Sequence, residues 1–413
     1  MSRTVVIGAG VIGLACAYEL RKRGEDVIVL DQRTPGSGCS AGNAGWIVPS
    51  LAEPLPMPGL TWTTLRWMFD ADSPLHISPA ALPEIAGWLW SFWRHCNASD
   101  YRAGLSAWAR LTDRLMESMD ALVADGVQME MYESGLLFVF LSEATMRHVS
   151  RQVAAAGGRG AEPLVGQALH DLEPALSNRV TAGLLIKDER HVRPESLCQG
   201  LQARIQQMGV EVRSDVTATG GVIEGETLRA VRTTQGDFVA DRCLIAAGAL
   251  SGRVSAAVAG VPLPIQAGKG YAVTVSGRPA PFSRPLYLDE ARLGCSPFAG
   301  GYRFAGTMEL SGLNDRLVPG RVAAIRRAAR RYLTLAPDAT EGVEWVGMRP
   351  LTSDGVPAIG PLPTRRNVYV ATGHQMLGVT TAVTTAMLIG DLMTRGRTAI
   401  DLSPFDPGRL SAR

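Results

Sequence analysis

The stretch TVVIGAGVIGLACAYELRKRGEDVIVLD, residues 4–31, has two short apolar runs separated by a glycine-rich turn and a helical pattern. The β-branched run at residues 4–7 predicts a buried strand, and residues 26–30 predict a second one. Between them the spacing GxGxxG is formed by Gly8, Gly10 and Gly13. Such glycines allow a tight turn, close approach of the backbone to a pyrophosphate and tight packing of helix on strand. The stretch therefore predicts a dinucleotide-binding βαβ unit.

The end of this unit indicates which dinucleotide is expected. The amides of residues 11–13 lie at the predicted N-terminus of the helix, where the helix dipole favours phosphate. Asp31, about twenty residues after the glycines, is placed to accept hydrogen bonds from both ribose hydroxyls. A carboxylate there repels a 2′-phosphate, which argues against NADP. The alternative is a glycine turn in an ordinary βαβ unit without a ligand.

Length and composition restrict the remaining choices. The chain has 413 residues, too many for one core, and we expect two domains. Its 41 basic and 39 acidic residues leave a formal charge of +2, so no nucleic-acid partner is expected. The six cysteines are scattered without CxxC pairs or histidines at metal-ligand spacing. We expect reduced thiols in a cytoplasmic protein without a metal site, and no secretory signal, because a strand begins within three residues.

Two apolar regions bear on membrane contact. Residues 367–390 are uncharged and long enough to span a bilayer, but they include His374, Gln375 and five threonines, so we expect a buried strand and helix. Residues 62–96 contain five of the eight tryptophans, namely Trp62, Trp67, Trp88, Trp90 and Trp93. Core or interdomain packing is the favoured interpretation. A patch contacting the inner face of the cytoplasmic membrane is the open alternative.

The middle of the chain predicts mixed structure. Helices are predicted at residues 142–156 and 194–208, each with start and stop signals. The alternating segments 221–234 and 238–245 predict a small antiparallel layer that ends in a central strand. That strand stops on the small residues Ala247 and Gly248, as a backbone does where it passes close to a bound cofactor. A tight strand-to-helix turn is the alternative.

The final third repeats the arrangement of a loop that feeds a helix. The turn-rich segment 347–361 contains Arg349 beside a proline and precedes a predicted strand at 368–371. The loop 372–378, TGHQMLG, then opens a helix that continues through residue 392. Its N-terminus presents a second positive dipole end, suited to negative charge on a reduced ring. Two such ends suggest one site for a pyrophosphate and one for the reacting ring.

Taken in order, these segments resemble a known family. The resemblance is carried by GAGVIG with Asp31, SAGNAG at 40–45, IAAGA at 245–249, KGY at 269–271, GMRPLTSDGVPAIG at 347–360 and TGHQMLG at 372–378. Over nearly the whole chain they resemble the FAD-dependent D-amino-acid oxidase superfamily. The wording of SAGNAG and GMRPLTSDG is most similar to bacterial D-amino-acid dehydrogenases of the small-subunit type, including hydroxy-D-proline dehydrogenases.

The resemblance implies an α/β fold with two domains. One is a Rossmann-type FAD-binding domain like that of glutathione reductase, and the other is an α+β substrate domain with a mixed sheet. The FAD-binding domain would be discontinuous, formed by residues 1–59, 190–260 and 343–413. Residues 60–189 and 261–342 would form the substrate domain over the flavin face.

The resemblance also implies FAD as the cofactor. It places the first glycines at the pyrophosphate, Asp31 at the adenosine ribose, residues 40–45 along the pyrophosphate and flavin, and residues 373–378 near the flavin pyrimidine. The expected cofactor residues are Gly8, Gly10, Val11, Ile12, Gly13, Asp31, Gln32, Ser40, Asn43, Ala44, Gly45, Ala247, Gly248, Gly373, Met376, Leu377 and Gly378.

Three residues are candidates for substrate contact. Arg349 matches the family arginine that binds the substrate carboxylate, and a bidentate pair there would direct the Cα hydrogen toward flavin N5. A structural ion pair with Asp354 is the alternative. Tyr271 is a candidate for contact with the carboxylate or amine, against a packing role. His374 is a candidate for a hydrogen bond to flavin or substrate, against a satisfied loop histidine.

The chain departs from the family pattern at one place. Relatives usually carry a further arginine on the strand before a GTMEL-like segment, where this chain has GCSPF at 294–298, with Pro297 at the corresponding position. Carboxylate binding would then rely on Arg349 alone or on compensation by Arg292. Both D-alanine-like substrates and cyclic imino acids such as a D-proline derivative are therefore expected.

The resemblance implies an enzyme of amino-acid catabolism that transfers hydride from Cα of a neutral-amine substrate to flavin N5. Residues 301–310 contain Arg303 but no lysine of the kind that some oxidases use to activate oxygen, which favours transfer of electrons to a quinone or another carrier. The alternatives are an FAD enzyme acting on sarcosine, glycine, a hydroxy acid or glycerol 3-phosphate, a flavin subunit that needs partner subunits, and an NAD-dependent dehydrogenase.

Overall fold

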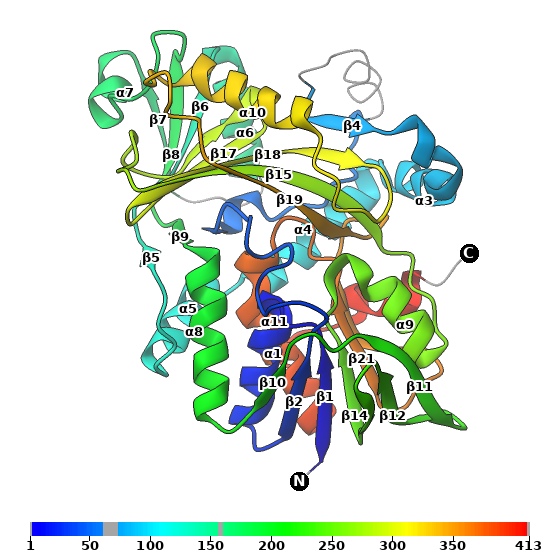
Figure 1. Ribbon diagram of the computed structural model, residues 1–413. Helices are drawn as coiled ribbons and strands as arrows, with labels where there is room; N and C mark the ends of the chain where they lie inside the picture. The colour runs from blue at the N-terminus through cyan, green and yellow to red at the C-terminus, as the bar shows by residue number, and fades with distance from the viewer. Residues whose placement is uncertain (1, 61–72, 156–159, 411–413) are drawn as a thin grey trace.

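A six-stranded sheet built around the predicted βαβ unit forms the lower half of the molecule (Figure 1). The computed structural model describes residues 2–60, 73–155 and 160–410. The strands, in spatial order, are β10 (Glu211–Arg213), β2 (Asp26–Leu30), β1 (Arg3–Ile7), β14 (Arg242–Ile245), β21 (Val368–Thr372) and β20 (Ala358–Pro361). The first five run parallel and β20 is antiparallel. The two strands predicted from residues 4–31 are thus confirmed.

Both faces of this sheet are covered, which explains its nearly continuous apolar strands. Val6 and Val29 pack into one core with helices α1 (Val11–Lys22), α8 (Pro194–Gln207) and α11 (Gly378–Arg395). On the other face, Val5 and Ile28 pack against a second core that contains α9 and a small antiparallel sheet. Those elements are α9 (Ser251–Ala259), β11 (Ala218–Glu224), β12 (Thr227–Thr233) and β13 (Gly236–Val239).

A larger mixed sheet forms the upper half. Its spatial order is β19 (Val343–Leu351), β15 (Gln266–Ser276), β18 (Gly301–Leu310), β17 (Leu293–Phe298), β16 (Leu286–Leu288), β6 (Leu136–Phe140), β8 (Ala182–Ile186) and β7 (Ala161–Val165), with β4 (Leu75–Ile77) paired to β18. Helix α10 (Pro319–Tyr332) covers the face turned away from the six-stranded sheet (Figure 1). The opposite face of this sheet therefore looks onto the lower half.

Further elements connect or flank the two halves. They are β3 (Trp46–Ile47), β5 (Met131–Tyr132), β9 (Arg190–Val192), α3 (Leu82–His95), α4 (Ala98–Thr112), α5 (Leu115–Ala124), α6 (Glu143–Ala155) and α7 (Gln167–Leu172). Helices α4 and α5 pack against α11 of the lower half, whereas β19 pairs along its length with β15 of the upper half. The domain division at residues 60, 190, 261 and 343 stays a prediction, and these contacts mark where the chain crosses between the halves.

Most of the predicted elements are confirmed, and one differs in detail. The helices predicted at 142–156 and 194–208 appear as α6 and α8. The segment 238–245 divides into β13 and β14 instead of continuing as one strand. Ala240 donates its amide to Arg229 of the small sheet, and Asp241 donates to Arg3 at the start of β1. The chain changes sheets between these two residues.

The two apolar regions considered for membrane contact, residues 367–390 and 62–96, have different structures. Within residues 2–60, 73–155 and 160–410, no helix combines the length and apolarity needed to cross a bilayer. Residues 367–390 form β21 and most of α11, as expected. Trp62 and Trp67 lie outside the described residues. Trp90 and Trp93, on α3, expose 62% and 50% of their surface, so the packing interpretation is wrong for these two.

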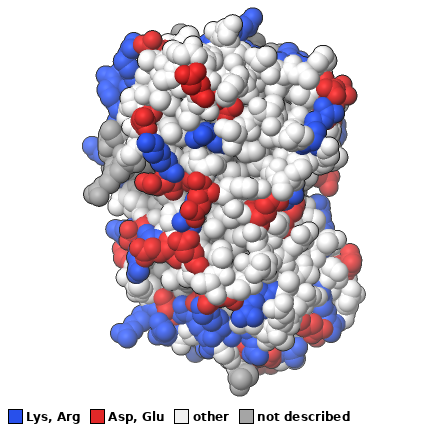
Figure 2. Space-filling model, turned by 90° about the vertical axis from the view of Figure 1, so that its left-hand side faces the viewer, with Lys and Arg blue, Asp and Glu red and all other residues white. Residues whose placement is uncertain are grey.

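One outer face shows how the near-zero net charge is distributed. In Figure 2 acidic and basic side chains lie next to one another over the lower half of the molecule, between broad areas of uncharged residues. Among the described residues, oppositely charged side chains form ion pairs, such as Lys22 with Asp125 and Arg190 with Asp120. This face therefore carries mixed charge instead of a continuous field of one sign.

Candidate functional site

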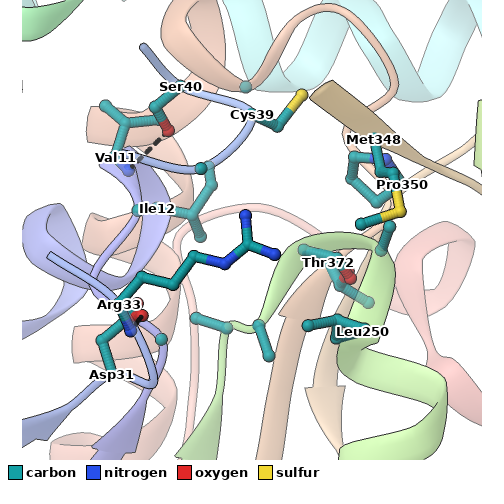
Figure 3. Close-up of a pocket in the computed structure, with 18 of the residues that line it drawn as sticks. Val11, Ile12, Asp31, Arg33, Cys39, Ser40, Leu250, Met348, Pro350 and Thr372 are labelled. Carbon is teal, nitrogen blue, oxygen red and sulfur yellow. Dashed lines mark hydrogen bonds between the residues drawn. The ribbon is translucent and has the colours of Figure 1, made fainter. Parts of the chain in front are cut away.

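A cavity opens at the carboxyl ends of β1, β2 and β14 and extends up to β19 of the large sheet (Figure 3). Ligands of open α/β sheets bind at this edge, outside the carboxyl ends of the parallel strands. The expected cofactor residues in its wall are Gly8, Gly10, Val11, Ile12, Asp31, Gln32, Ser40, Asn43, Ala247, Gly248 and Gly378. The structure thus brings together residues from five separate stretches of the sequence.

The glycine-rich turn at residues 8–13 needs glycine for steric reasons. Gly8 has φ +110°, and a Cβ there would lie 2.4 Å from the carbonyl oxygen of Ala246. A Cβ at Gly13 would lie 1.8 Å from the carbonyl oxygen of Gly8. Gly13 does not line the cavity, and its role is the close packing of α1 on β1 that the spacing predicts.

The N-terminus of α1 and the end of β2 present polar groups to the cavity. The Val11 amide donates to Ser40 Oγ at 3.0 Å, the bond drawn in Figure 3. Asp31 accepts from the amide of Ala9 at 2.6 Å and from that of Arg33 at 2.8 Å, one on each carboxylate oxygen. Burial raises the pKa of Asp31 above its usual value. Each carboxylate oxygen keeps lone-pair capacity for a ribose hydroxyl.

Arg33 is a cavity residue that sequence reasoning missed. Its side chain extends across the cavity in Figure 3, and its Nη2 lies 3.4 Å from Asp315 Oδ2 on the loop after β18. Cys39, Met348 and Pro350 also line the cavity without having been expected there as contacts. The sequence offered one signal for this role, since Arg33 follows Asp31 by only two residues. The direction of its exposed side chain, however, depends on its partner across the cavity, Asp315, which spacing does not reveal.

Two loops that were expected at the flavin hold each other in place. Asn43 donates from Nδ2 to the carbonyl of Met376 at 3.0 Å, and its Oδ1 accepts from the amide of Gly45 at 2.8 Å. A Cβ at Gly45 would lie 1.9 Å from the carbonyl oxygen of Val192. Ala44, Gly45, Gly373, Met376 and Leu377 do not line the cavity, although they belong to the same two loops.

The loop before α11 contributes two buried polar side chains. His374 lines the cavity, its Nε2 lies 3.1 Å from Thr385 Oγ1, and burial lowers its pKa to about 3. The imidazole is therefore neutral at neutral pH. Gln375 donates from Nε2 to the carbonyl of Gly355, and its Oε1 is buried with no hydrogen-bond partner among the described residues. The cavity wall thus holds an unused acceptor.

Arg349 lies on β19 next to the cavity-lining residues Met348 and Pro350. Its Nη1 donates to the carbonyl of Thr307 at 2.7 Å, and its guanidinium crosses Gly270, where a Cβ would lie 2.2 Å from Nη2. Burial lowers its pKa, but a guanidinium stays charged at neutral pH.

The structural alternative for Arg349 was a pair with Asp354. That carboxylate instead accepts from Arg409 at 2.7 Å. Within the described part of the chain, no carboxylate lies within ion-pair distance of Arg349. The arginine is therefore a partly buried cation without a carboxylate partner among the described residues.

Tyr271 is not brought to the cavity. It is fully buried in the core beneath α10, together with Val273 and Val275. Its hydroxyl donates to Glu309, which also pairs with Lys269 at 2.9 Å. The ring of Tyr271 thus packs in the core, and its hydroxyl takes part in a buried polar network with Glu309 and Lys269.

Arg292, the expected compensating arginine, lies at the turn between β16 and β17. Its Nη1 is 3.3 Å from the hydroxyl of Tyr287 and 3.7 Å from Asp289 Oδ1, and 47% of its side chain is exposed. Tyr287 packs edge-on against Trp46 with ring centroids 5.6 Å apart. Arg292 therefore belongs to a separate cluster with Tyr287 and Asp289.

Comparison with known proteins agrees with this arrangement. A family model described as FAD dependent oxidoreductase matches residues 3–392. D-amino acid dehydrogenase of Vibrio cholerae serotype O1 is 30% identical over 416 residues, covering 98% of each chain. Its similarity to this chain extends over both halves of the molecule.

Solved structures show the same fold. Glycine oxidase from Geobacillus kaustophilus superposes with a TM-score of 0.73 at 24% identity and covers 100% of both chains. L-proline dehydrogenase from P. horikoshii gives a TM-score of 0.74 at 19% identity, covering 99% of this chain and 97% of that one. L-alpha-glycerophosphate oxidase from Mycoplasma pneumoniae, with FAD bound, gives 0.70 at 15% identity, covering 98% of each. The expected fold class is confirmed.

Proposed function

The chain belongs to the FAD dependent oxidoreductase family, and we propose that it oxidises D-amino acids or cyclic D-imino acids by hydride transfer from Cα to FAD. The 30% identity to D-amino acid dehydrogenase supports this substrate class. The observation that carries the proposal is Arg349, a partly buried cation that has no carboxylate partner among the described residues. An α-amino carboxylate supplies that partner.

The cavity fits the FAD of this family. A Cβ at Gly8 or Gly13 would collide with backbone atoms, so the turn and α1 pack tightly on the strands, while Gly10 in the cavity wall leaves the backbone open to a pyrophosphate. Asp31 has free acceptor capacity for a ribose. At the other end, Gln375 Oε1 is a buried acceptor without a partner among the described residues, which suits the N–H of a flavin ring.

Arg349 gives the site its preference for an acid. Taking a guanidinium out of water is costly unless an anion pairs with it. Thr307 occupies part of its hydrogen-bonding capacity through the carbonyl on Nη1, and the remaining donors stay available for a bidentate carboxylate. A carboxylate held at two points has its Cα substituents oriented, which lowers the entropic part of the barrier.

The protein needs little acid–base chemistry of its own. Bound FAD supplies the hydride acceptor at N5 of its ring. The substrate amine must be neutral before transfer, and its proton passes to water. His374 is neutral because burial holds its pKa at about 3, so it acts as a hydrogen-bonding group and not as a cation near the site. Oxidation yields an imine, which water hydrolyses to an oxo acid unless the amine is cyclic.

We also propose that a quinone or another carrier accepts the electrons. Lys269 on β15 has its ammonium bonded to Glu309, Asn314 Oδ1 and the carbonyl of Arg316, so it is not available to activate oxygen. The exposed pair Trp90 and Trp93 on α3 supports contact with a membrane, where quinones reside. Release of peroxide in air at the rate of substrate turnover would contradict this acceptor.

The test is an anaerobic titration of the FAD-loaded protein, in which the absorbance of oxidised flavin is followed at about 450 nm. The substrates are D- and L-proline, cis-4-hydroxy-D-proline, D-alanine, glycine, sarcosine and glycerol 3-phosphate. We expect bleaching by a D-amino or D-imino acid. Bleaching by a substrate without an amine, or only after addition of a partner extract, would replace the proposal by the corresponding alternative.

A substitution tests the role of Arg349 directly. Arg349→Met should lower kcat/KM for the bleaching substrate at least about a thousandfold, or about 4 kcal/mol, with FAD still bound. The matched control is Arg326→Met, because Arg326 also donates to a carbonyl, that of Thr340, and pairs with Glu344, but lies on α10. A loss below about tenfold in Arg349→Met would exclude the carboxylate role.

A further inference from the structure

Arg303 lies on β18 and has only 3% of its surface exposed. Its guanidinium nevertheless reaches out of the large sheet to the loop at residues 40–45. We propose that Arg303 is a positioning residue that holds this loop in its cofactor-binding shape and so determines the affinity for FAD. The proposal rests on the loop as a cofactor contact and is independent of which substrate is oxidised.

The guanidinium has four partners in three separate segments. Nη1 donates to the carbonyls of Ala41 at 2.7 Å and Asn43 at 2.8 Å. Nε donates to Thr274 Oγ1 on β15 at 2.9 Å, and Nη2 pairs with Glu195 in the first turn of α8. A planar fork with fixed donors suits this task, whereas an ammonium cannot reach all four acceptors at once.

The hydrogen bonds from Arg303 to the carbonyls of Ala41 and Asn43 also determine where the next amide in each peptide plane points. In a trans peptide the N–H lies antiparallel to the C=O of the same plane. The N–H groups of Gly42 and Ala44 therefore point away from Arg303. Neither donates a hydrogen bond to any residue that the structure describes. Arg303 thus leaves these two backbone donors of the loop without a partner in the described protein.

Other contacts hold the same side of the loop. The carbonyl of Ala44 accepts from Ser296 Oγ on β17 at 2.7 Å. Gly42 lies under the Trp345 indole, where a Cβ would come within 2.1 Å of the ring. The loop is therefore fastened to the large sheet by its carbonyls. Arg303 supplies the charged part of that attachment, since Ser296 and Trp345 are neutral.

Arg303 also relates the loop to the proposed carboxylate site. Four residues further along β18, the carbonyl of Thr307 accepts from Arg349. A strand advances about 3.4 Å per residue, so one rigid element spaces the two sites about 14 Å apart along its axis. The Thr307 carbonyl is part of the β18 backbone, whereas Arg303 reaches the loop through its side chain.

The experiment measures FAD binding to the apoprotein without substrate. Arg303→Met should weaken FAD at least about tenfold, because two charge-assisted hydrogen bonds to the loop are lost. Arg326→Met, on α10, is the control and should stay within about twofold. Hydrogen exchange of apo Arg303→Met should accelerate in the peptide covering residues 40–45 and stay unchanged in the six-stranded sheet.

Two results would overturn the proposal. One is a folded Arg303→Met that binds FAD within about twofold of the parent protein. The other is weaker binding with hydrogen exchange accelerated equally throughout the chain, which would assign Arg303 a general structural role. If Arg303→Met does not fold, Arg303→Lys replaces it under the same criteria, since it keeps the charge beside Glu195 but only part of the loop attachment. Substrate oxidation does not enter either measurement.

Discussion

At the scale of single residues, burial of His374 has a consequence for acid stability. Its pKa is about 3 in the folded protein and 6.5 in the unfolded chain, so between these values only the unfolded chain binds the proton. Folding stability from this residue is complete above pH 6.5 and is lost as the pH falls below it. Each unit by which the pH falls in this range lowers the free energy of unfolding by up to about 1.4 kcal/mol. His191, with a pKa of about 4, acts in the same direction.

We therefore expect His374→Gln to flatten the acid side of the stability profile. Urea denaturation at pH 7.5 and pH 5 gives the free energy of unfolding, and the drop between them should be smaller in His374→Gln than in the parent by about 1 to 2 kcal/mol. The control is His148→Gln, since His148 is exposed on α6. Equal drops in both variants would mean that His374 is protonated in the folded protein.

At the scale of elements, β18 contains an extra residue opposite β15. Lys269 pairs with Glu309 and Tyr271 pairs with Gly306, so one residue of β15 faces two of β18. Thr307 lies in this bulge with φ +56°, a conformation that a β-branched residue adopts only under strain. Its Oγ1 is buried without a partner among the described residues. The bulge turns the Thr307 carbonyl toward Arg349, which is a reason to retain the strain.

Removing the side chain should release this strain and keep the carbonyl. We expect Thr307→Gly to stabilise the protein by about 1 kcal/mol, because glycine adopts positive φ freely and the buried hydroxyl is lost. Thr307→Val keeps the strained backbone and should gain less. Urea denaturation at pH 7.5 compares them. A Thr307→Gly protein that is less stable than Thr307→Val would show that the bulge is not strained.

At the scale of the whole molecule, α3 presents an aromatic surface on the outside of the upper half. Trp90 and Trp93 stack with ring centroids 5.0 Å apart, and both are exposed. Indole rings favour the membrane interface. The double substitution Trp90→Ser and Trp93→Ser should lower sedimentation with anionic phospholipid vesicles at least about fivefold, through loss of buried apolar area. Val239→Ser, an exposed apolar residue on β13, is the control. Unchanged sedimentation of the double variant would exclude α3 as the contact.

The candidate site could be predicted where local geometry decides it. The glycines at 8, 10 and 13 and the acid at 31 belong to one continuous βαβ unit, so their spacing alone places them at the same edge of a sheet. The loop at 372–378 likewise precedes its helix directly. For such residues the contacts that matter are within a few tens of positions along the chain.

Residues in the large sheet could not be placed in this way. Tyr271 and Gly270 are neighbours on β15, but successive side chains of a strand point to opposite faces, and only the packing of α10 decides that Tyr271 is turned away from the cavity. Asp354 was a sequence-near partner for Arg349, yet Arg409 takes it from the C-terminal end. Long-range pairs of this kind have no signal in spacing.

The sequence alone thus determined the βαβ unit, because this unit depends on residue types at short, fixed intervals, and its motifs carry the resemblance that implies the family and the cofactor. Only the tertiary structure decided that Arg349 has no carboxylate partner among the described residues, that Arg33 crosses the cavity and that Arg303 bonds to the loop at 40–45. Each of these three features depends on a side chain that meets a carbonyl or carboxylate group far away in the sequence. That choice is made by how the two halves pack.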